Sequence, residues 1–230
     1  MNESVPKEAR YELKFVSPPF EFDRLLTWIR LNSACFHTSF DDRLVNNVYF
    51  DTYNFTAYNE NLSGTSERQK LRYRWYGDDV YPSKGNLEIK CRRNVYGWKK
   101  SFKILNDPYI AGDSWDLVKK RLKQQLDDKV QLWIDCNPQV VITNRYLRKY
   151  FVSSDGKIRI TVDRDLKVYD QRYCSTPNVS RESNIPGSVI LEFKCHRKDR
   201  NLVSSVINTI PIRVSRNSKY VNAVTSINRF

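Results

Sequence analysis

The chain has 230 residues, of which 40% are hydrophobic and 13% aromatic, so we expect a packed core and exclude global disorder. It carries 39 Lys and Arg against 26 Asp and Glu. The net charge of +13 favours an anionic partner: a nucleic acid, a polyphosphate, a nucleotide or an anionic membrane surface. The five cysteines form no CxxC pair and there are only two histidines, which argues against a disulfide framework, a zinc site or histidine-based catalysis.

Several other classes are also excluded. No apolar run approaches the roughly 20 residues of a membrane span. The sequence contains neither GxxxxGKS/T nor GxGxxG, the glycine-rich loops that bind nucleotide phosphates. We expect no signal peptide, and the cysteine usage makes a reducing cytoplasmic compartment the default. The length allows one large domain or two small ones, and we expect a single domain over residues 1–230.

Segments in which polar and apolar residues alternate predict strands. In chain order they are Arg10–Val16, Leu44–Asp51, Arg68–Gly77, Asn86–Arg93, Trp98–Leu105, Val140–Ser153, Lys157–Arg164 and Ser188–His196. Three amphipathic helices are interspersed with them: Phe20–Leu31, Trp115–Leu126 with Ser114 as its N-cap, and Asn201–Ile210, which ends at Pro211. Many strands with few helices predict an α+β fold built on a large antiparallel sheet or barrel.

The charged residues of these strands fall on one face, because successive residues of a strand point to opposite sides. These faces hold Arg10, Glu12 and Lys14; Arg68, Lys70, Arg72 and Arg74; Glu88, Lys90 and Arg92; Lys99, Ser101 and Lys103; Arg159, Thr161 and Asp163; and Glu192 and Lys194. The opposite faces are apolar, as in Leu71, Tyr73 and Trp75. Three strands repeat the tripeptide Glu-x-Lys, at residues 12–14, 88–90 and 192–194.

Two arrangements explain this pattern. For any single strand, the ordinary interpretation is a half-buried sheet with a charged solvent face. Six such strands together favour a closed barrel whose charged faces line a wet lumen, while its apolar faces pack outward against the helices. Such a lumen needs a polyanion to offset the repulsion among its cations, and its carboxylates would hold a divalent cation bound together with that polyanion. For Asp163, two roles stay open: a second metal ligand or a salt-bridge partner.

The motifs RYELKF, VYFDT, KLRYRWYG, LEIKCRR, SFK, TNRYLRKYF, IRITVD, LEFK and SKY occur in this order. This order resembles the vacuolar transporter chaperone (VTC) domain of polyphosphate polymerases, which belongs to the triphosphate tunnel metalloenzymes, or CYTH superfamily. The resemblance runs from Arg10 to about Val224. It implies a closed antiparallel eight-stranded β-barrel with helices packed outside. The implied activity is an ATP-dependent polyphosphate polymerase that uses Mn²⁺ or Mg²⁺ to transfer the γ-phosphate of ATP to a growing inorganic polyphosphate chain.

The resemblance also implies which side chains act. The residues that would contact phosphate are Lys14, Arg72, Arg74, Lys90, Lys103, Arg145, Arg159, Lys194, Ser218 and Lys219. The catalytic group would be Arg72, Arg74, Lys90, Lys103 and Glu192. Glu192 would hold the metal, and Glu12 and Glu88 match acidic members of the tunnel wall.

The chain departs from the family pattern at two positions. Many hydrolases of the superfamily begin with Glu-x-Glu-x-Lys, but Arg10 stands first here, which weakens the case for water activation. Asn61 stands where the eukaryotic polymerases carry an arginine. Neither an SPX domain nor a membrane anchor is recognised, so a separate membrane partner is conceivable and a nucleic acid partner is not expected. Two other functions stay open: hydrolysis of tri- or polyphosphate or a nucleoside triphosphate, and non-catalytic binding of polyphosphate or single-stranded nucleic acid.

Overall fold

The fold is seen in a computed structural model that describes residues 5–228; the ends of the predicted domain, residues 1–4 and 229–230, lie outside the described residues. Eight strands lie within that range: β1 (Arg10–Ser17), β2 (His37–Asp51), β3 (Glu67–Tyr76), β4 (Gly85–Arg93), β5 (Tyr96–Ile104), β6 (Gln139–Val152), β7 (Ile158–Asp170) and β8 (Val189–His196). Each overlaps one of the predicted strands, so all eight predictions are confirmed. β2 and β7 are longer than predicted, because both continue past the alternating part of their sequences.

Three helices correspond to the predicted ones: α1 (Phe22–Leu31), α3 (Trp115–Lys123) and α5 (Arg200–Ile207). Ser114 caps α3, since its hydroxyl accepts a hydrogen bond from the backbone N–H of Leu117. The helical segments without a prediction are η1 (Pro19–Glu21), α2 (Thr56–Leu62), α4 (Asp128–Cys136), η2 (Arg197–Asp199) and α6 (Lys219–Ile227). Between residues 5 and 228, no helix has the length and apolar character needed to cross a lipid bilayer.

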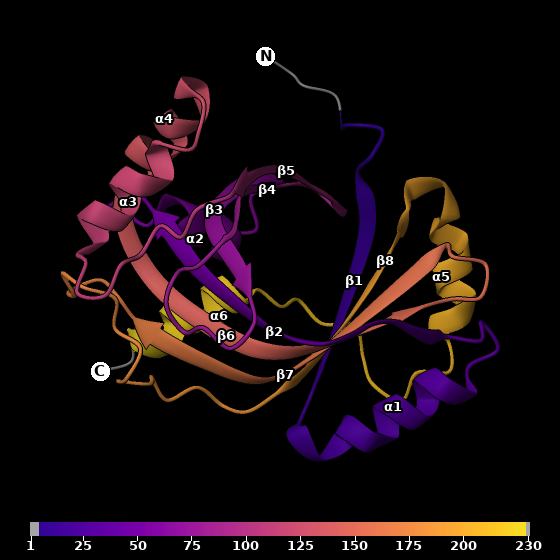
Figure 1. Cartoon of the computed structure of the whole chain (residues 1–230). Helices are drawn as coiled ribbons and strands as arrows, with labels where there is room; N and C mark the ends of the chain where they lie inside the picture. Colours follow the sequence, from indigo (N-terminus) through magenta and orange to yellow (C-terminus); the bar gives the residue numbers. More distant parts are fainter. Residues whose placement is uncertain (1–4, 229–230) are drawn as a thin grey trace.

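The strands form one antiparallel sheet that closes into a ring in the order β1-β5-β4-β3-β2-β6-β7-β8, and β8 pairs again with β1 (Figure 1). The α+β class and the eight-stranded antiparallel ring agree with the prediction. The seam between β1 and β5 is the shortest contact, with only the pairs Arg10↔Gly97 and Tyr11↔Tyr96. By contrast, β1 pairs with β8 along its whole length, from Arg10 to Ser17.

The apolar strand faces point outward and are covered by helices, as predicted. On one side, Phe15 of β1 and Phe193 of β8 pack with α1 and α5 in one cluster of buried side chains. On the opposite side of the ring, Tyr73 and Trp75 of β3 pack with α3 and α4 in a second cluster. Because the hydrophobic effect places these apolar faces under the helices, the charged faces of the same strands point into the ring.

One helix departs from the predicted external position. α6 lies within the outline of the ring in Figure 1, and its residues Lys219, Val221 and Asn222 line the cavity inside. Tyr220 of α6 stacks on Tyr49 of β2 at a centroid distance of 5.1 Å and is fully buried. The expectation that all helices pack outside is therefore wrong for α6, which forms part of the inner wall.

Candidate functional site

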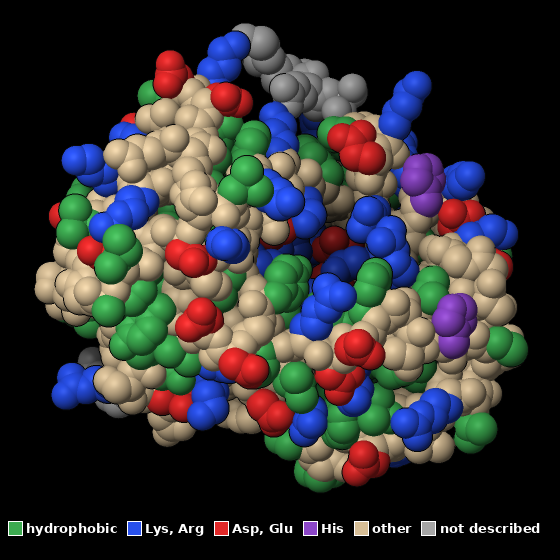
Figure 2. All heavy atoms as spheres, viewed as in Figure 1, with side chains coloured by type: hydrophobic (Ala, Val, Ile, Leu, Met, Phe, Trp, Pro, Cys, Tyr) green, Lys and Arg blue, Asp and Glu red, His purple; other side chains and the backbone are tan. Residues whose placement is uncertain are grey.

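A cavity of about 780 Å³ lies inside the ring, lined by the charged strand faces. Eleven of its lining residues are basic: Lys14, Arg68, Lys70, Arg72, Arg74, Lys90, Arg92, Arg148, Lys194, Arg216 and Lys219. Two are acidic, Glu12 and Glu192. Figure 2 shows Lys and Arg side chains gathered around a hollow near the middle of this face. The cavity therefore carries a large excess of positive charge, which an anion inside it would offset.

The β3–β4 pair supplies the guanidinium groups deepest in the cavity. Arg72 binds the buried Glu88 through two nitrogens, with Nε–Oε2 and Nη2–Oε2 distances of 2.7 and 2.6 Å. Burial alone would raise the pKa of Glu88, but Arg72, Arg74 and Lys99 hold it far below its ordinary value. Glu88 is thus a fixed anion that orients Arg72.

Arg74 has a different environment, because its partners within the described residues are neutral. Its Nε donates to Oδ1 of Asn47 at 2.7 Å, and its Nη2 donates to the hydroxyl of Tyr146 at 3.0 Å. Only 6% of Arg74 is exposed, so its positive charge is largely removed from water, and Glu88, the carboxylate whose pKa it lowers, is bound by Arg72 and Lys99 instead. Such a charge favours a bound anion strongly.

Three lysines of the cavity wall, Lys14, Lys70 and Lys90, lie close enough to repel one another. Lys70 and Lys90 stand directly opposite each other on β3 and β4. Burial, and then the neighbouring Lys14 and Lys90, lower the pKa of Lys70 well below its ordinary value. The Lys70 amine donates to the Ser218 hydroxyl at 2.7 Å and forms no ion pair within the described residues. A phosphate group here would remove this repulsion and raise the pKa of Lys70.

Glu192 on β8 is the best-placed metal ligand in the cavity. Its Oε2 lies 2.8 Å from Nζ of Lys194, whereas its Oε1 lies 3.6 Å from Nζ of Lys14 and accepts no hydrogen bond from the described residues. Burial alone would raise the pKa of Glu192, but Lys194, Lys14 and Lys90 hold it well below its usual range. Glu192 is therefore an ionised, buried carboxylate with one oxygen free for a cation.

Glu12 on β1 lies next to this carboxylate and interacts with it electrostatically. Within residues 5–228, no cluster of three or more Asp, Glu, His or Cys side chains could surround a metal ion. Mg²⁺ commonly binds through one or two carboxylates and completes its shell with substrate phosphates and water. The residues present fit a metal of that kind, held by Glu192 with Glu12 nearby.

Asp163 on β7 is a salt-bridge partner, which resolves the alternative left open above. It accepts from Nε and Nη2 of Arg148 at 2.5 and 2.7 Å, and from the amine of Lys219. Burial alone would raise the pKa of Asp163, but Arg148 and then Lys219 hold it far below its ordinary value. Both oxygens of Asp163 accept hydrogen bonds from cations, so its charge is already balanced by Arg148 and Lys219. It holds Arg148 and Lys219 at the cavity wall.

Residues 9–228 match the VTC domain family. The chain belongs to that family. Subunit 2 of the vacuolar transporter chaperone complex of Schizosaccharomyces pombe is 26% identical to this VTC domain over 133 residues. That match covers 51% of the chain and 18% of the yeast protein, so the chain spans only a small part of its relative's length. The family resemblance inferred from the motifs is confirmed.

Solved structures share the fold of this VTC domain. A putative adenylyl cyclase from Hippeastrum, whose structure is said to reveal a dominant triphosphatase activity, aligns with a TM-score of 0.54 and 16% identity, over 92% of this chain and 93% of that one. A putative adenylate cyclase from Vibrio parahaemolyticus aligns with a TM-score of 0.51 and 12% identity, over 94% and 98% of the two chains. These two proteins therefore share the fold of this VTC domain over nearly the whole chain.

The structure of the VTC domain brings together most of the residues that the motifs pointed to. Those lining the cavity are Lys14, Arg72, Arg74, Lys90, Glu192, Lys194, Ser218 and Lys219. Three others lie outside the lining. Lys103 is exposed near the end of β5, Arg159 is exposed on β7, and Arg145 lies 3.7 Å from Asp78. We therefore leave these three out of the site proposed below.

Two lining residues on β6 were missed by the sequence analysis. Tyr146 and Arg148 point into the cavity, whereas Arg145, chosen from the same motif, does not line it. Burial alone would raise the pKa of Tyr146, but Arg148, Arg74 and Lys219 lower it to about 8. Applying the two-residue alternation to β6 would have grouped Tyr146 with Arg148, but it could not have told which of the two faces was the inner one.

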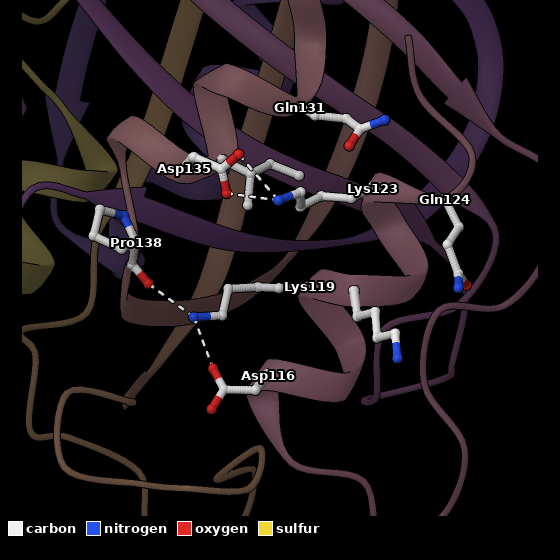
Figure 3. A pocket seen from close by; sticks show the side chains of 9 residues that line it. Asp116, Lys119, Lys123, Gln124, Gln131, Asp135 and Pro138 are labelled. Carbon is white, nitrogen blue, oxygen red and sulfur yellow. Dashed lines mark hydrogen bonds and ion pairs between the residues drawn. The ribbon is translucent and has the colours of Figure 1, made fainter. Parts of the chain in front are cut away.

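A second cavity lies outside the ring, between α3 and α4 (Figure 3). Two of its three lysines already have partners: Lys119 binds Asp116 and the carbonyl of Pro138, and Lys123 binds Asp135. The acidic groups there offset much of the basic charge. The cavity inside the ring is therefore the better site for a polyanion.

Proposed function

We propose that this VTC domain is a metal-dependent polyphosphate polymerase, which transfers the γ-phosphate of ATP to a growing polyphosphate chain inside the ring. The observation that carries the proposal is the composition of the cavity wall, where eleven basic residues face two carboxylates. A charge imbalance of this size in a partly enclosed space fits a linear, highly charged anion better than a small neutral ligand. The likeness to a subunit of the VTC complex supports polyphosphate as the substrate class and favours a protein partner.

Binding would rest on Arg72, Arg74 and Lys90. Each guanidinium presents several N–H groups in a plane and can bind two phosphate oxygens at once, while a lysine adds a mobile point charge. Glu88 and Asn47 hold Arg72 and Arg74 in place before substrate arrives. Orientation of this kind lowers the barrier to transfer because the cationic groups need not reorganise as charge moves between phosphates.

Glu192, with Glu12 nearby, would hold a Mn²⁺ or Mg²⁺ ion. Such an ion, when bound, would neutralise the charge that develops on the phosphate oxygens during transfer. Oε1 of Glu192, which is buried and accepts no hydrogen bond from the described residues, is the oxygen that would bind the ion. Lys14 and Lys194 flank the carboxylate and keep it ionised.

In the transfer step, a terminal oxygen of the polyphosphate chain attacks the γ-phosphorus of ATP. The bond from that phosphorus to the β–γ bridging oxygen breaks, and ADP leaves with the electron pair. Both reacting groups are phosphates, so the protein supplies alignment and charge compensation rather than a covalent nucleophile. Arg148 and Lys219, which Asp163 holds at the wall, would bind the equatorial oxygens in this proposal.

Hydrolysis of triphosphate is the second candidate, and the activity stated for the Hippeastrum protein favours it. The two reactions differ in what attacks the γ-phosphorus, a chain oxygen or water. Both lining carboxylates interact with lysines, Glu12 with Lys90 and Glu192 with Lys194. A carboxylate held in an ion pair is a weak base toward water, and we therefore favour transfer over hydrolysis.

Incubation with ATP and Mn²⁺ tests the proposal. A polymerase produces one ADP for each phosphate unit added to the polyphosphate chain. A hydrolase produces ADP and free phosphate, and a binding protein leaves ATP intact. The Glu192→Ala variant should abolish turnover and leave polyphosphate binding within about threefold of wild type. The matched control is Glu182→Ala, which removes an exposed carboxylate paired with Lys167 away from the cavity and should keep full turnover.

A further inference from the structure

Three arginines stand at the mouth of the cavity, and no function is assigned to them above. They are Arg68 on β3, Arg92 on β4 and Arg216 in the segment before α6. We call them the mouth cluster. All three line the same cavity as Lys14 and Lys90, and Arg92 and Arg216 are the two cations that act most strongly on Arg68. The mouth cluster is thus one continuous patch of positive charge joined to the interior.

The mouth cluster is held together against repulsion. Arg68 and Arg92 are direct cross-strand neighbours, an arrangement in which like charges destabilise a sheet. Burial, followed by Arg92 and Arg216, lowers the pKa of Arg68, and Glu60 opposes this only in part. Within residues 5–228, none of the three arginines forms an ion pair at 4 Å or less. A fold that keeps three cations together in this way favours an anionic ligand at the mouth.

The guanidinium groups keep donors available for such a ligand. Arg68 donates to the carbonyl of Thr65 at 2.5 Å, and Arg92 donates to the carbonyl of Asn94 at 2.8 Å. Each of these bonds uses one nitrogen of a group that carries five N–H donors. The carbonyls therefore fix the directions of the two guanidiniums while most of their donors stay free.

The spacing along β3 indicates how long the ligand is. The inward residues Arg68, Lys70, Arg72 and Arg74 follow one another at every second position. At about 3.3 Å per residue, the row spans roughly 20 Å from the mouth cluster to Arg74. A triphosphate bound at Arg72 and Arg74 is too short to reach Arg68. Only a longer phosphate chain can contact both ends of the row.

We propose that the mouth cluster binds the part of a linear polyphosphate that extends beyond the phosphates held at Arg72 and Arg74. This inference rests on the proposed function, since it places the same substrate class in the cavity. It adds a subsite that discriminates by chain length: long chains gain contacts at the mouth, and triphosphate does not. Lys70 and Lys90, opposite each other between the two ends, continue the path.

The test compares the binding of tripolyphosphate and of long-chain polyphosphate to wild type and to a variant with Arg68→Gln, Arg92→Gln and Arg216→Gln. At about 0.15 M salt, where charges beyond roughly 8 Å are largely screened, we expect long-chain affinity to fall about tenfold or more. Tripolyphosphate affinity should change by less than about threefold. The charge-matched control is Arg24→Gln, Arg30→Gln and Lys129→Gln, which removes three exposed cations outside the cavity and should leave both affinities unchanged.

The outcomes separate the two proposals. If wild type binds neither anion, the proposed function itself fails. If wild type binds both and the triple variant loses both equally, or loses neither, the mouth subsite is refuted while the proposed function stands. Loss of the Arg68–Arg92 repulsion should leave the thermal unfolding midpoint equal to or above that of wild type. Should the triple variant not fold, Arg216→Gln alone, in an exposed segment, gives the same comparison with a smaller effect.

Discussion

The buried ion pair between Asp163 and Arg148 gives the sharpest test of the cavity wall. Asp163 is 2% exposed, accepts two hydrogen bonds from Arg148 and also binds Lys219, the first residue of α6. Asp163→Asn keeps the shape but removes the charge, so two cations stay buried without their counter-ion. Breaking a buried pair in this way costs about 3 kcal/mol. For a chain of this size, we expect the midpoint of thermal unfolding to fall by roughly 6–12 °C.

The pH dependence of this variant has a defined sign. The pKa of Asp163 lies below its unfolded value, so its contribution to stability is complete above about pH 4 and is lost as the pH falls further. The difference between wild type and Asp163→Asn should therefore be largest at neutral pH and shrink in acid. Saturating tripolyphosphate should also reduce it, because the bound anion supplies charge opposite Arg148 and Lys219.

Urea unfolding at pH 7, followed by circular dichroism, measures the free energy of unfolding. Asp135→Asn is the matched control: it removes the carboxylate of an exposed pair with Lys123, whose Nζ–Oδ1 distance is 2.7 Å. Its cost should be below about 1 kcal/mol. A loss of less than 1 kcal/mol for Asp163→Asn would show that Asp163 does not hold the two cations in a buried network, and that its assignment as a salt-bridge partner is wrong.

Three further predictions concern ligand binding. Arg74→Ala should weaken tripolyphosphate binding by about 2 kcal/mol, or roughly thirtyfold, measured by calorimetry; a change below twofold would place Arg74 outside the phosphate path. Because the pKa of Tyr146 is about 8, ionisation above that pH puts a negative charge between Arg74 and Arg148, and phosphate affinity should fall from pH 7 to pH 9. Tyr146→Phe should reduce this fall, and an unchanged pH profile would contradict the assignment. Removal of divalent metal with a chelator should stop turnover but leave polyphosphate bound, as seen by gel mobility; continued turnover would refute the role of Glu192.

The strands, and the residues that share each strand face, could be predicted from sequence because both depend on local alternation. Once Leu71, Tyr73 and Trp75 are assigned to one side of β3, Arg72 and Arg74 must lie on the other. Which face is the inner one depends on what covers the apolar set, and in this fold an external layer of helices covers it.

The missed features depend on contacts distant in sequence. α6 contains several β-branched residues and no strong helical signal, but Ser218 caps it and Tyr220 donates to the buried Asp51. α2 likewise begins where Asp51 accepts the backbone N–H groups of Ala57 and Tyr58. No local pattern contains these partners, because β2, α2 and α6 meet only in the folded chain.

The errors in the site have equally specific causes. Arg145 and Arg148 lie three residues apart on β6 and therefore point to opposite faces, so Arg148 lines the cavity and Arg145 does not. Lys103 has the expected parity, opposite Asn86, but it lies near the end of β5, beyond the cavity. Parity gives the face that a side chain belongs to, whereas its depth along the ring depends on strand tilt and length.

The most direct measurement is a structure of this VTC domain with tripolyphosphate and Mn²⁺. Phosphate groups should lie within hydrogen-bond distance of Arg72, Arg74 and Lys90, with the metal beside Glu192. A ligand bound instead at the lysines of α3, with only water among the strand cations, would contradict the account.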